Sequence, residues 1–359
     1  MERVITYTVD NPLPRQKVRG FLKLKHYSTH SLKRLRDQPE SILVNGEPVF
    51  LNHMLRPGDV ITVRIREEAS SDQILPVCLP VDILYEDEDL MIINKAAGMP
   101  VHPSQNNRDN TLGNALAWYF GQRNQSFVYR CVNRLDRDTS GLTIVAKHMV
   151  SGGILAAMTA EKTLRENRTV TGDRENDAGG QAAAMKKRGG GSRETGTGEE
   201  RILSVRREYL AIAEGEMPPG EGIIDAPIGR VEGSCLMRRV DEENGERAVT
   251  RYRVLGTGGG CSLVSLELLT GRTHQIRVHM AHLGFPLIGD YLYNPKNTRM
   301  NRQALHACRL RFCHPMTGEP MDFLAPLPED MRRALEELGI DILPKLCNTN
   351  PTEGNMIGR

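Results

Sequence analysis

The sequence predicts an α+β fold, because its strand-like and helix-like segments do not alternate in the regular way of a doubly wound sheet. Residues 81–95 contain two short apolar strands around an acidic turn, and residues 142–147 follow a strand pattern. Residues 111–120 are expected to form a helix after a loop at residues 98–103. We therefore expect a mixed or antiparallel sheet with a few helices.

Length and composition restrict the class of protein. The chain has 359 residues, of which 39% are hydrophobic, so two domains with ordinary cores are expected. A formal net charge of +2 is too small to indicate nucleic-acid binding by itself. The seven cysteines include no Cys-x-x-Cys pair, which fits a reducing compartment. No signal peptide is visible, nor an apolar run near the ~18 residues that cross a bilayer. We expect a cytoplasmic monomer that binds no membrane.

Positive charge is clustered near the start of the chain. Between Arg15 and Arg36 the sequence carries eight basic residues and no acidic one. A helical stretch lies in this region, and residues 42–47 and 55–63 then contain Asn-Gly and Pro-Gly-Asp turns between apolar runs. Basic residues gathered on one side of a small module are what phosphate binding requires. The predicted RNA-contacting residues are Lys17, Arg19, Lys23, Lys25, Lys33, Arg34 and Arg36.

The densest charge lies at residues 134–141, Arg-Leu-Asp-Arg-Asp-Thr-Ser-Gly, directly before a strand pattern. Two interpretations are open from this segment alone. Asp136 and Asp138 could be turn formers that bind local backbone groups beside solvated arginines. Alternatively, an acidic side chain is presented here at the edge of a scaffold for chemistry. An aspartic-protease site does not fit, because Ser140 interrupts the Asp-Thr-Gly triplet and no second copy exists.

Segments far along the chain decide between these interpretations. Residues 271–279 read Gly-Arg-Thr-His-Gln-Ile-Arg-Val-His, residues 283–290 read Leu-Gly-Phe-Pro-Leu-Ile-Gly-Asp, and residues 207–211 read Arg-Glu-Tyr-Leu-Ala. Together with residues 134–136 they resemble, in the right order, the three catalytic motifs of the RluA-like family of pseudouridine synthases. The resemblance covers roughly residues 80–340 with one interruption. It implies a pseudouridine synthase catalytic domain.

The resemblance assigns roles to single residues. Asp136 matches the essential catalytic carboxylate of the family, and Arg277 matches the arginine that pairs with it. Tyr209 matches the aromatic residue that lies on the flipped uracil, and Arg134 the residue that fills the space left by the base. The family usually has histidine at position 133, whereas Asn133 cannot titrate near neutral pH, so any step that needs a titrating group there is in doubt. Further substrate contacts are expected from Arg272, His274 and Ile276.

The chemistry explains why these residue types are needed. Converting uridine to pseudouridine breaks the glycosidic bond, turns the uracil and rejoins it through a ring carbon, so no atom is lost, no redox step occurs and no cofactor is expected. A carboxylate with an ordinary pKa of about 3.9 is ionised at neutral pH and can act as nucleophile or base. An opposite charge keeps it ionised in a partly dry pocket. A stacked uridine must first be extruded, at a cost of a few kcal/mol.

The N-terminal region resembles the S-four-like RNA-binding module that often precedes these synthases, chiefly at residues 44–46 (Val-Asn-Gly) and 56–59 (Arg-Pro-Gly-Asp). A small basic capping domain is the alternative. An interruption of the catalytic region is poor in apolar residues, which predicts disorder. The expected divisions are an RNA-binding module at 1–70, a linker at 71–80, a catalytic domain at 81–340 with the disordered insertion at 165–200, and a loose tail at 341–359.

Two groups of potential metal ligands occur in the sequence. They are His274, His279 and His282, and then His306, Cys308, Cys313 and His314. Neither group has the spacing of a structural zinc site. No metal is expected.

A second class of function stays open, namely an RNA-binding or ribosome-assembly factor that keeps the fold without turnover. Asp136, Tyr209 and Arg277 argue against it, because binding alone does not require this trio. The residues do not fix the RNA target. By analogy with the family, a basic N-terminal module favours large-subunit ribosomal RNA over transfer RNA.

Overall fold

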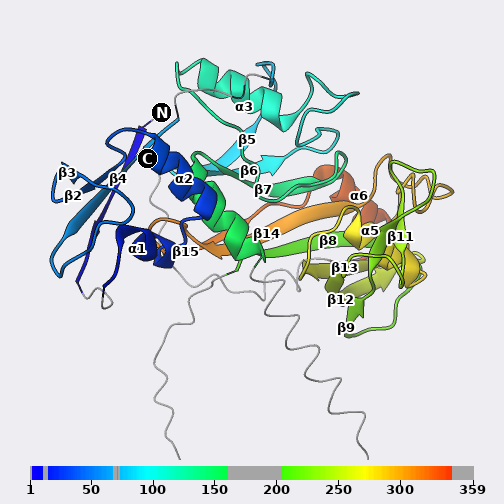
Figure 1. The fold of residues 1–359 in the computed structure, drawn as a ribbon. Helices are drawn as coiled ribbons and strands as arrows, with labels where there is room; N and C mark the ends of the chain where they lie inside the picture. Colours follow the sequence, from blue (N-terminus) through cyan, green and yellow to red (C-terminus); the bar gives the residue numbers. More distant parts are fainter. Residues whose placement is uncertain (1, 11–14, 68–70, 72, 161–203, 342–359) are drawn as a thin grey trace, which may run out of the picture.

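The described residues fold around two larger β-sheets and a short two-stranded sheet, with helices packed on them (Figure 1). A computed structural model describes residues 2–10, 15–67, 71, 73–160 and 204–341. The expected insertion at residues 165–200 lies outside this part of the chain, as does the expected tail apart from Asp341. Strands of both directions occur in the larger sheet, and helices are interspersed, which confirms the predicted α+β class.

Residues 2–67, called the N-terminal module below, form a small antiparallel sheet with two helices. Its elements are β1 (Glu2–Thr8), α1 (Val18–Leu24), α2 (Thr29–Asp37), β2 (Ile42–Val44), β3 (Glu47–Pro48) and β4 (Val60–Arg66). The strand order is β1-β4-β2-β3. Asn45 and Gly46 form the turn between β2 and β3 with positive φ values of 53° and 88°. Ser28 caps α2 by accepting a hydrogen bond from the Ser31 N–H at 3.0 Å.

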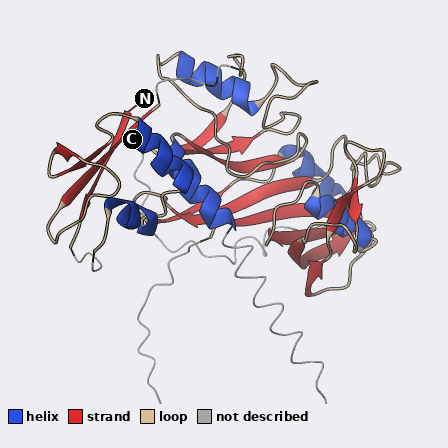
Figure 2. Ribbon diagram, viewed as in Figure 1, coloured by secondary structure: helices blue, strands red, loops and turns tan. Residues whose placement is uncertain are grey.

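The larger sheet lies in the remaining part of the described chain, and Figure 2 distinguishes its strands from the helices. Its strands are β5 (Asp82–Glu86), β6 (Leu90–Lys95), β7 (Ser140–Ala146), β8 (Arg206–Glu214), β9 (Glu221–Asp225), β12 (Val249–Gly258), β13 (Cys261–Leu268), β14 (Leu305–Cys313) and β15 (Pro320–Leu324). Their order is β5-β6-β7-β14-β8-β13-β12-β9, with β15 on β14. All pairs are antiparallel except the central pair of β7 and β14.

Shorter elements complete the described fold. They are a ribbon of β10 (Ile228–Arg230) and β11 (Arg238–Val240), and the helices α3 (Leu112–Gly121), α5 (Gln275–His282), α6 (Glu329–Glu337) and a helix over residues 149–160. None of the helices in the described ranges is long and apolar enough to span a membrane.

The parallel pair places the start of β7 at the centre of the sheet. Gly141 pairs there with Ala307 of β14. Gly141 has a φ of +108°, and a Cβ on it would lie 2.2 Å from the Ala307 carbonyl oxygen, so the approach requires glycine. The loop before Gly141, which carries residues 134–139, is therefore held over the middle of the sheet.

Both faces of the larger sheet are buried. Leu90 and Ile92 of β6 belong to the hydrophobic cluster on one face, while Met91 and Ile93 belong to the cluster on the other. The first cluster is continuous with α1, α2 and β4, so the N-terminal module and the sheet share one core. The second cluster contains α3, α5 and residues of the candidate site.

Buried ion pairs also join the module to the larger sheet. Arg3 of β1 donates from Nε and Nη2 to the two oxygens of Asp89, at 2.8 and 3.2 Å. Glu67, directly after β4, accepts from Arg130 Nη2 at 2.9 Å and from the Met149 N–H at 2.9 Å. Both carboxylates are buried. Ion pairs that exclude water have little freedom of geometry, so these contacts fix the orientation of the module.

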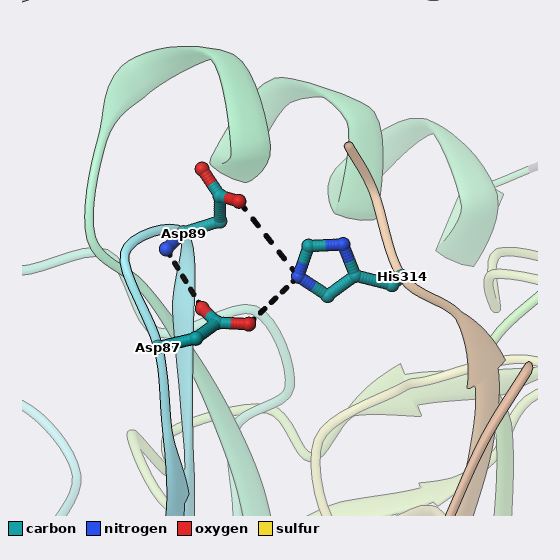
Figure 3. Close-up of side chains that lie close together, drawn as sticks. All are labelled: Asp87, Asp89 and His314. Carbon is teal, nitrogen blue, oxygen red and sulfur yellow. Dashed lines mark hydrogen bonds and ion pairs between the residues drawn. The ribbon is translucent and has the colours of Figure 1, made fainter. Parts of the chain in front are cut away.

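Asp89 also belongs to a compact polar cluster with Asp87 and His314, drawn in Figure 3. His314 Nδ1 accepts from two backbone N–H groups, so Nε2 carries the proton and donates to Asp87 at 2.9 Å. Burial opposes the ionisation of both aspartates. The hydrogen bond from His314 nevertheless keeps the Asp87 pKa below its ordinary value. Hydrogen bonds from His148 and Arg3 likewise lower the Asp89 pKa.

Acid should weaken the fold through these aspartates. A carboxyl group whose folded-state pKa lies below its ordinary value of 3.8 stabilises the fold above that pH, and this contribution is lost as the pH falls. We expect Asp89→Asn to lower the unfolding free energy at neutral pH by about 1–3 kcal/mol and to flatten the acid dependence in urea denaturation. Glu88→Gln is the control, since Glu88 pairs with the same Arg3 at 2.7 Å but is 73% exposed. Equal losses in the two variants would contradict this account.

Candidate active site

A pocket of about 580 Å³ opens beside the motif residues. Its wall comes from segments far apart in sequence, at residues 100–102, 132–137, 156–160, 207–209 and 268–273. The charged and aromatic side chains in this wall belong to His102, Arg134, Asp136, Arg137, Arg207, Tyr209 and Arg272. A narrower extension reaches His274, Ile276 and Arg277. The fold therefore collects the three sequence motifs around one pocket.

Asp136 borders the pocket and is held by a buried arginine. Arg277 Nη1 donates to Asp136 Oδ2 at 3.1 Å. The same guanidinium donates from Nε and Nη2 to the two oxygens of Asp290, at 2.7 and 2.8 Å. The Arg277 side chain is 2% exposed, whereas that of Asp136 keeps 25% of its surface accessible. The structure thus brings together the pair expected from the sequence and adds Asp290 behind it.

The surroundings of Arg277 keep it charged. Burial works against the cation, but the hydrogen bonds and charge of Asp290, and then those of Asp136, outweigh burial and raise the Arg277 pKa. The rings of Tyr293 and Tyr291 lie 5.1 and 5.7 Å from its guanidinium carbon. Asp290 is itself fixed by two backbone N–H groups at 3.0 and 3.2 Å. A permanent cation therefore faces Asp136 from the protein interior.

His274 lies next to the same carboxylate, with Nε2 3.9 Å from Asp136 Oδ2. Its backbone has a φ of +59°, a strained value for a residue with a side chain. The Tyr293 hydroxyl accepts from the Arg238 N–H at 3.0 Å and lies within hydrogen-bond distance, 2.9 Å, of His274 Nδ1. Burial lowers the His274 pKa, so the ring is neutral at pH 7.

Tyr209 lies in β8 with its ring in the pocket wall. Backbone pairing with Leu266 of β13 and Ala307 of β14 fixes the strand on both sides. Burial raises the Tyr209 pKa to about 12, so the hydroxyl keeps its proton at neutral pH. The flat ring can stack on a base near Asp136, and its protonated hydroxyl can donate a hydrogen bond.

Residues 132–137 all line the pocket but differ in exposure. Asn133 is buried, Arg134 is exposed at the pocket wall, and Asp136 is partly buried. The Asn133 amide behaves as a peptide group of a strand: Oδ1 accepts from the Ile144 N–H at 2.8 Å, and Nδ2 donates to the Leu142 carbonyl at 3.1 Å. The residue that departs from the family pattern therefore anchors the loop to β7.

The remaining expected substrate contacts differ in their surroundings. Arg272 lines the pocket, and its guanidinium is held by the Arg247 carbonyl at 3.1 Å and by an ion pair with Glu246. Ile276 is buried in the core and reaches the narrow extension of the pocket. Arg272 can meet a polar part of a substrate, whereas Ile276 shapes the pocket from within the core.

A buried lysine supports the loop that carries Asp136. Lys95, at the end of β6, is 1% exposed. Its Nζ donates to the carbonyl oxygens of Ala96, Met99 and Arg137, at 2.7, 2.8 and 3.0 Å. Burial lowers the Lys95 pKa to about 7, although the charges of Asp138 and Asp136 oppose the shift. Lys95 thus ties two loops of the site together through their backbones.

The basic residues expected to contact RNA lie on α1, α2 and the segment before them. Those that are exposed are Lys17, Arg19, Lys23, Lys25, Lys33 and Arg36. Arg34 is partly buried and lies 4.0 Å from the buried Glu67. Lys17, Arg19 and Arg36 line one hollow. The predicted basic surface is therefore present, with Arg34 turned toward an acid of the module.

The groups of metal ligands considered in the sequence do not assemble in the described part of the chain. The potential ligand atoms that lie within 4.8 Å of one another there belong to Asp87, Asp89 and His314. Each of these side chains already has hydrogen-bond partners, and the proton on His314 Nε2 occupies the position that a metal would need. We interpret the cluster as a hydrogen-bonding network.

Asp290 and Lys95 are residues of the site whose roles sequence reasoning missed. Asp290 follows Gly289, which has a φ of +69°. A Cβ on Gly289 would lie 2.2 Å from the Arg302 carbonyl oxygen. A Gly-Asp pair after an apolar run was a visible signal for a tight turn with a hydrogen-bonded carboxylate. Lys95 gave no such signal, because its partners are backbone carbonyls.

Removing one partner of the buried ion pair between Arg277 and Asp290 should destabilise the fold more than the same change in a pair at the surface. We expect Asp290→Asn to lower the unfolding free energy by about 3–5 kcal/mol, because it deprives a buried guanidinium of its main counter-ion. Asp322→Asn is the control: Asp322 binds Arg309 through two bonds of 2.9 and 2.6 Å but is 42% exposed, so the loss should be about 1 kcal/mol or less. Chemical denaturation of both variants tests this, and similar losses would argue against the role of burial.

Comparisons with known proteins cover most of the chain. A model of the family described as RNA pseudouridylate synthase matches residues 89–189 and 199–282. The Bacillus subtilis protein named RNA pseudouridine synthase YjbO is 36% identical over 82% of this chain and 89% of its own. The ribosomal large subunit pseudouridine synthase D of Xanthomonas campestris is 35% identical over 83% of this chain and 81% of its own. The enzyme of that name from Escherichia coli (strain K12) is 34% identical over 85% of this chain and 81% of its own. The protein therefore belongs to the RNA pseudouridylate synthase family.

Proposed function

We propose that this synthase isomerises specific uridines of structured RNA with Asp136 as the reacting carboxylate. The observation that carries the proposal is the line of Asp136, Arg277 and Asp290, in which a partly exposed carboxylate is backed by a buried cation. The cation holds Asp136 in one orientation beside the pocket through a hydrogen bond to Oδ2. An ionised, oriented carboxylate is what attack on a sugar or removal of a proton requires.

The reaction must balance within one nucleotide. The glycosidic carbon–nitrogen bond breaks, and the same sugar carbon forms a carbon–carbon bond to the turned uracil. The ring carbon then loses a proton and the ring nitrogen gains one, so the product is an isomer. Tyr209 supports the ring while it turns, and its protonated hydroxyl can donate a hydrogen bond to the base. His274 lies next to the reacting carboxylate, with Nε2 3.9 Å from Asp136 Oδ2.

The substrate uridine must leave its helix to reach Asp136. The pocket of about 580 Å³ lies within the ~300–1,000 Å³ range of small-molecule sites, so it can receive a single nucleotide. Arg134 is exposed at the pocket wall. Its planar cation can fill the space that the base leaves, because it stacks on neighbouring bases and also pairs with phosphate.

We propose large-subunit ribosomal RNA as the substrate class. Two relatives that match over most of their length are named ribosomal large subunit pseudouridine synthase D. The exposed cations of α1 and α2 supply phosphate contacts outside the catalytic pocket. The enzyme would meet this RNA in the cytoplasm, the compartment expected from the sequence. Transfer RNA is the alternative substrate, and a ribosome-assembly factor without turnover is the alternative function.

Mapping pseudouridines in RNA from cells with and without the gene distinguishes these alternatives. Loss of the gene should remove pseudouridine from defined positions of large-subunit ribosomal RNA. Loss confined to transfer RNA would refute the substrate proposal. An unchanged map would favour the assembly factor.

Asp136→Asn should reduce pseudouridine formation to background, because it removes the reactive charge and keeps the size of the side chain. RNA affinity should stay close to wild type. Asp138→Asn is the matched control, since Asp138 lies two residues further on, pairs with Arg137 at 2.8 Å and does not line the pocket. A single-turnover assay with transcribed RNA and excess enzyme measures both. Appreciable turnover by purified Asp136→Asn enzyme would contradict the assignment of Asp136 as the reacting carboxylate.

Lys95→Met should slow the single-turnover rate roughly ten- to a hundredfold, because the Asp136 loop loses a fixed point and small misplacements reduce rates steeply. The wild-type rate should also fall as the pH rises above the Lys95 pKa of about 7, since a neutral amine donates one hydrogen bond fewer than an ammonium. This alkaline decline should be missing from Lys95→Met. A pH profile of both enzymes tests this, and identical declines would exclude Lys95 as their source.

A further inference from the structure

Phe50 is the most exposed of the large hydrophobic side chains in the described residues, at 79%. Its neighbours Val49 and Leu51 pack into the core of the N-terminal module. Backbone hydrogen bonds fix the turn, from the His53 N–H to the Phe50 carbonyl at 3.0 Å and from the Arg19 N–H to the Leu51 carbonyl at 2.9 Å. A rigid turn therefore holds the ring outside, although burial of so large an apolar surface would stabilise the fold.

Two hollows meet at this ring. The first, called the Phe50 hollow below, has a volume of about 400 Å³ and is lined by Lys17, Arg19, Arg36, Phe50, Leu51 and Asn52. The second has a volume of about 240 Å³ and lies between the end of α2 and the turn after β3. It shares Arg36, Phe50 and Leu51 with the first. The aromatic ring thus borders a groove rather than a flat surface.

The Phe50 hollow is positively charged. In the described ranges no carboxylate lies within 4.0 Å of the Lys17 or Arg19 charges, and Arg36 pairs with its exposed neighbour Asp37 at 2.7 Å. Asn52 adds an amide that can both donate and accept. An aromatic surface next to several cations suits a ligand with a flat apolar ring and negative charge. Nucleotides combine these two properties.

We propose that the Phe50 hollow binds an unpaired nucleotide of the substrate RNA, with its base stacked on Phe50 and its phosphates on Lys17, Arg19 and Arg36. The proposal rests on the proposed action on RNA and adds a recognition element outside the catalytic pocket. A base within a duplex is stacked on its neighbours and cannot lie on the ring, so the site selects loops, bulges or single-stranded segments.

The hollow has a fixed relation to the catalytic pocket. Helix α2 packs with its first turn on the helix over residues 149–160, where a Cβ on Gly153 would lie 3.4 Å from Ser31 Oγ. Ala156 and Thr159 of that helix line the catalytic pocket. One helix therefore separates the module from the pocket, and an RNA bound in the hollow would be held at a set distance from Asp136.

The test compares Phe50→Ala, Phe50→Trp and Leu24→Ala in fluorescence anisotropy with a labelled oligouridylate and with an RNA duplex. Leu24 is the matched control, because it is 60% exposed on α1 and lines neither hollow. Phe50→Ala should weaken oligouridylate binding about five- to a hundredfold and leave duplex binding unchanged. Its salt dependence should match that of the wild type, since no charge is removed. Phe50→Trp should keep the affinity, and Leu24→Ala should have no effect.

The variant Arg19→Ala distinguishes the contribution of positive charge to RNA binding from the contribution of base stacking. It should weaken binding of both RNAs and reduce the salt slope by about one unit, because one phosphate contact disappears. Wild-type oligouridylate affinity in Phe50→Ala, or equal losses for oligouridylate and duplex, would overturn the proposal. Thermal melting curves that match the curve of the wild type show that the variants are folded.

The anisotropy measurements of RNA binding do not depend on turnover. The proposed function and the proposed nucleotide site at Phe50 can therefore fail separately. If the wild-type enzyme is active but Phe50→Ala leaves the oligouridylate affinity unchanged, nucleotide binding in the Phe50 hollow is refuted. The proposed function is then unaffected. A wild-type protein that forms no pseudouridine in any RNA refutes the proposed function, while a selective loss in Phe50→Ala still supports the hollow.

Discussion

One buried guanidinium determines the geometry of the candidate active site. Arg277 binds Asp290 with two hydrogen bonds and Asp136 with a third, so a single side chain connects α5, the loop after it and the loop before β7. Arginine suits this task because its donors are spread over a rigid planar fork, whereas a lysine would present a compact charge. Burying a cation is unfavourable unless acceptors surround it, and Asp290 supplies them from a fully buried position. The arrangement therefore serves to position Asp136 more than to raise the net stability of the fold.

The sequence indicated the motif residues that lie around one pocket, whereas the residues that support them could not be predicted. Asp136, Tyr209 and Arg277 stand in contiguous segments that resemble a family pattern, and the α+β class followed from the spacing of strands and turns. Whether a charged side chain such as Lys95 is buried depends on packing between segments far apart in the chain. The parallel pairing of β7 with β14 is also invisible locally, because it joins residues more than a hundred positions apart.

The N-terminal module shows the same division. The basic character of α1 and α2 was evident from composition, but composition did not reveal that Arg34 approaches a buried carboxylate while Lys17, Arg19 and Arg36 gather around a hollow. Phe50 stands in an apolar run, where an aromatic residue is ordinarily assigned to the core. Its exposure results from the turn that follows β3, whose geometry depends on hydrogen bonds to α1.

The shared core of module and sheet also constrains the RNA. A domain on a loose tether could adjust to many substrates, but this module is joined to the sheet by continuous apolar packing and buried ion pairs. If the module binds RNA as proposed above, the RNA has to match the fixed distance between the module and the pocket. A uridine would be chosen by its distance and angle from a second structural feature, with the neighbouring bases of secondary importance. Lengthening an RNA helix between the two features by a few base pairs would carry the uridine away from the pocket and rotate it around the helix axis.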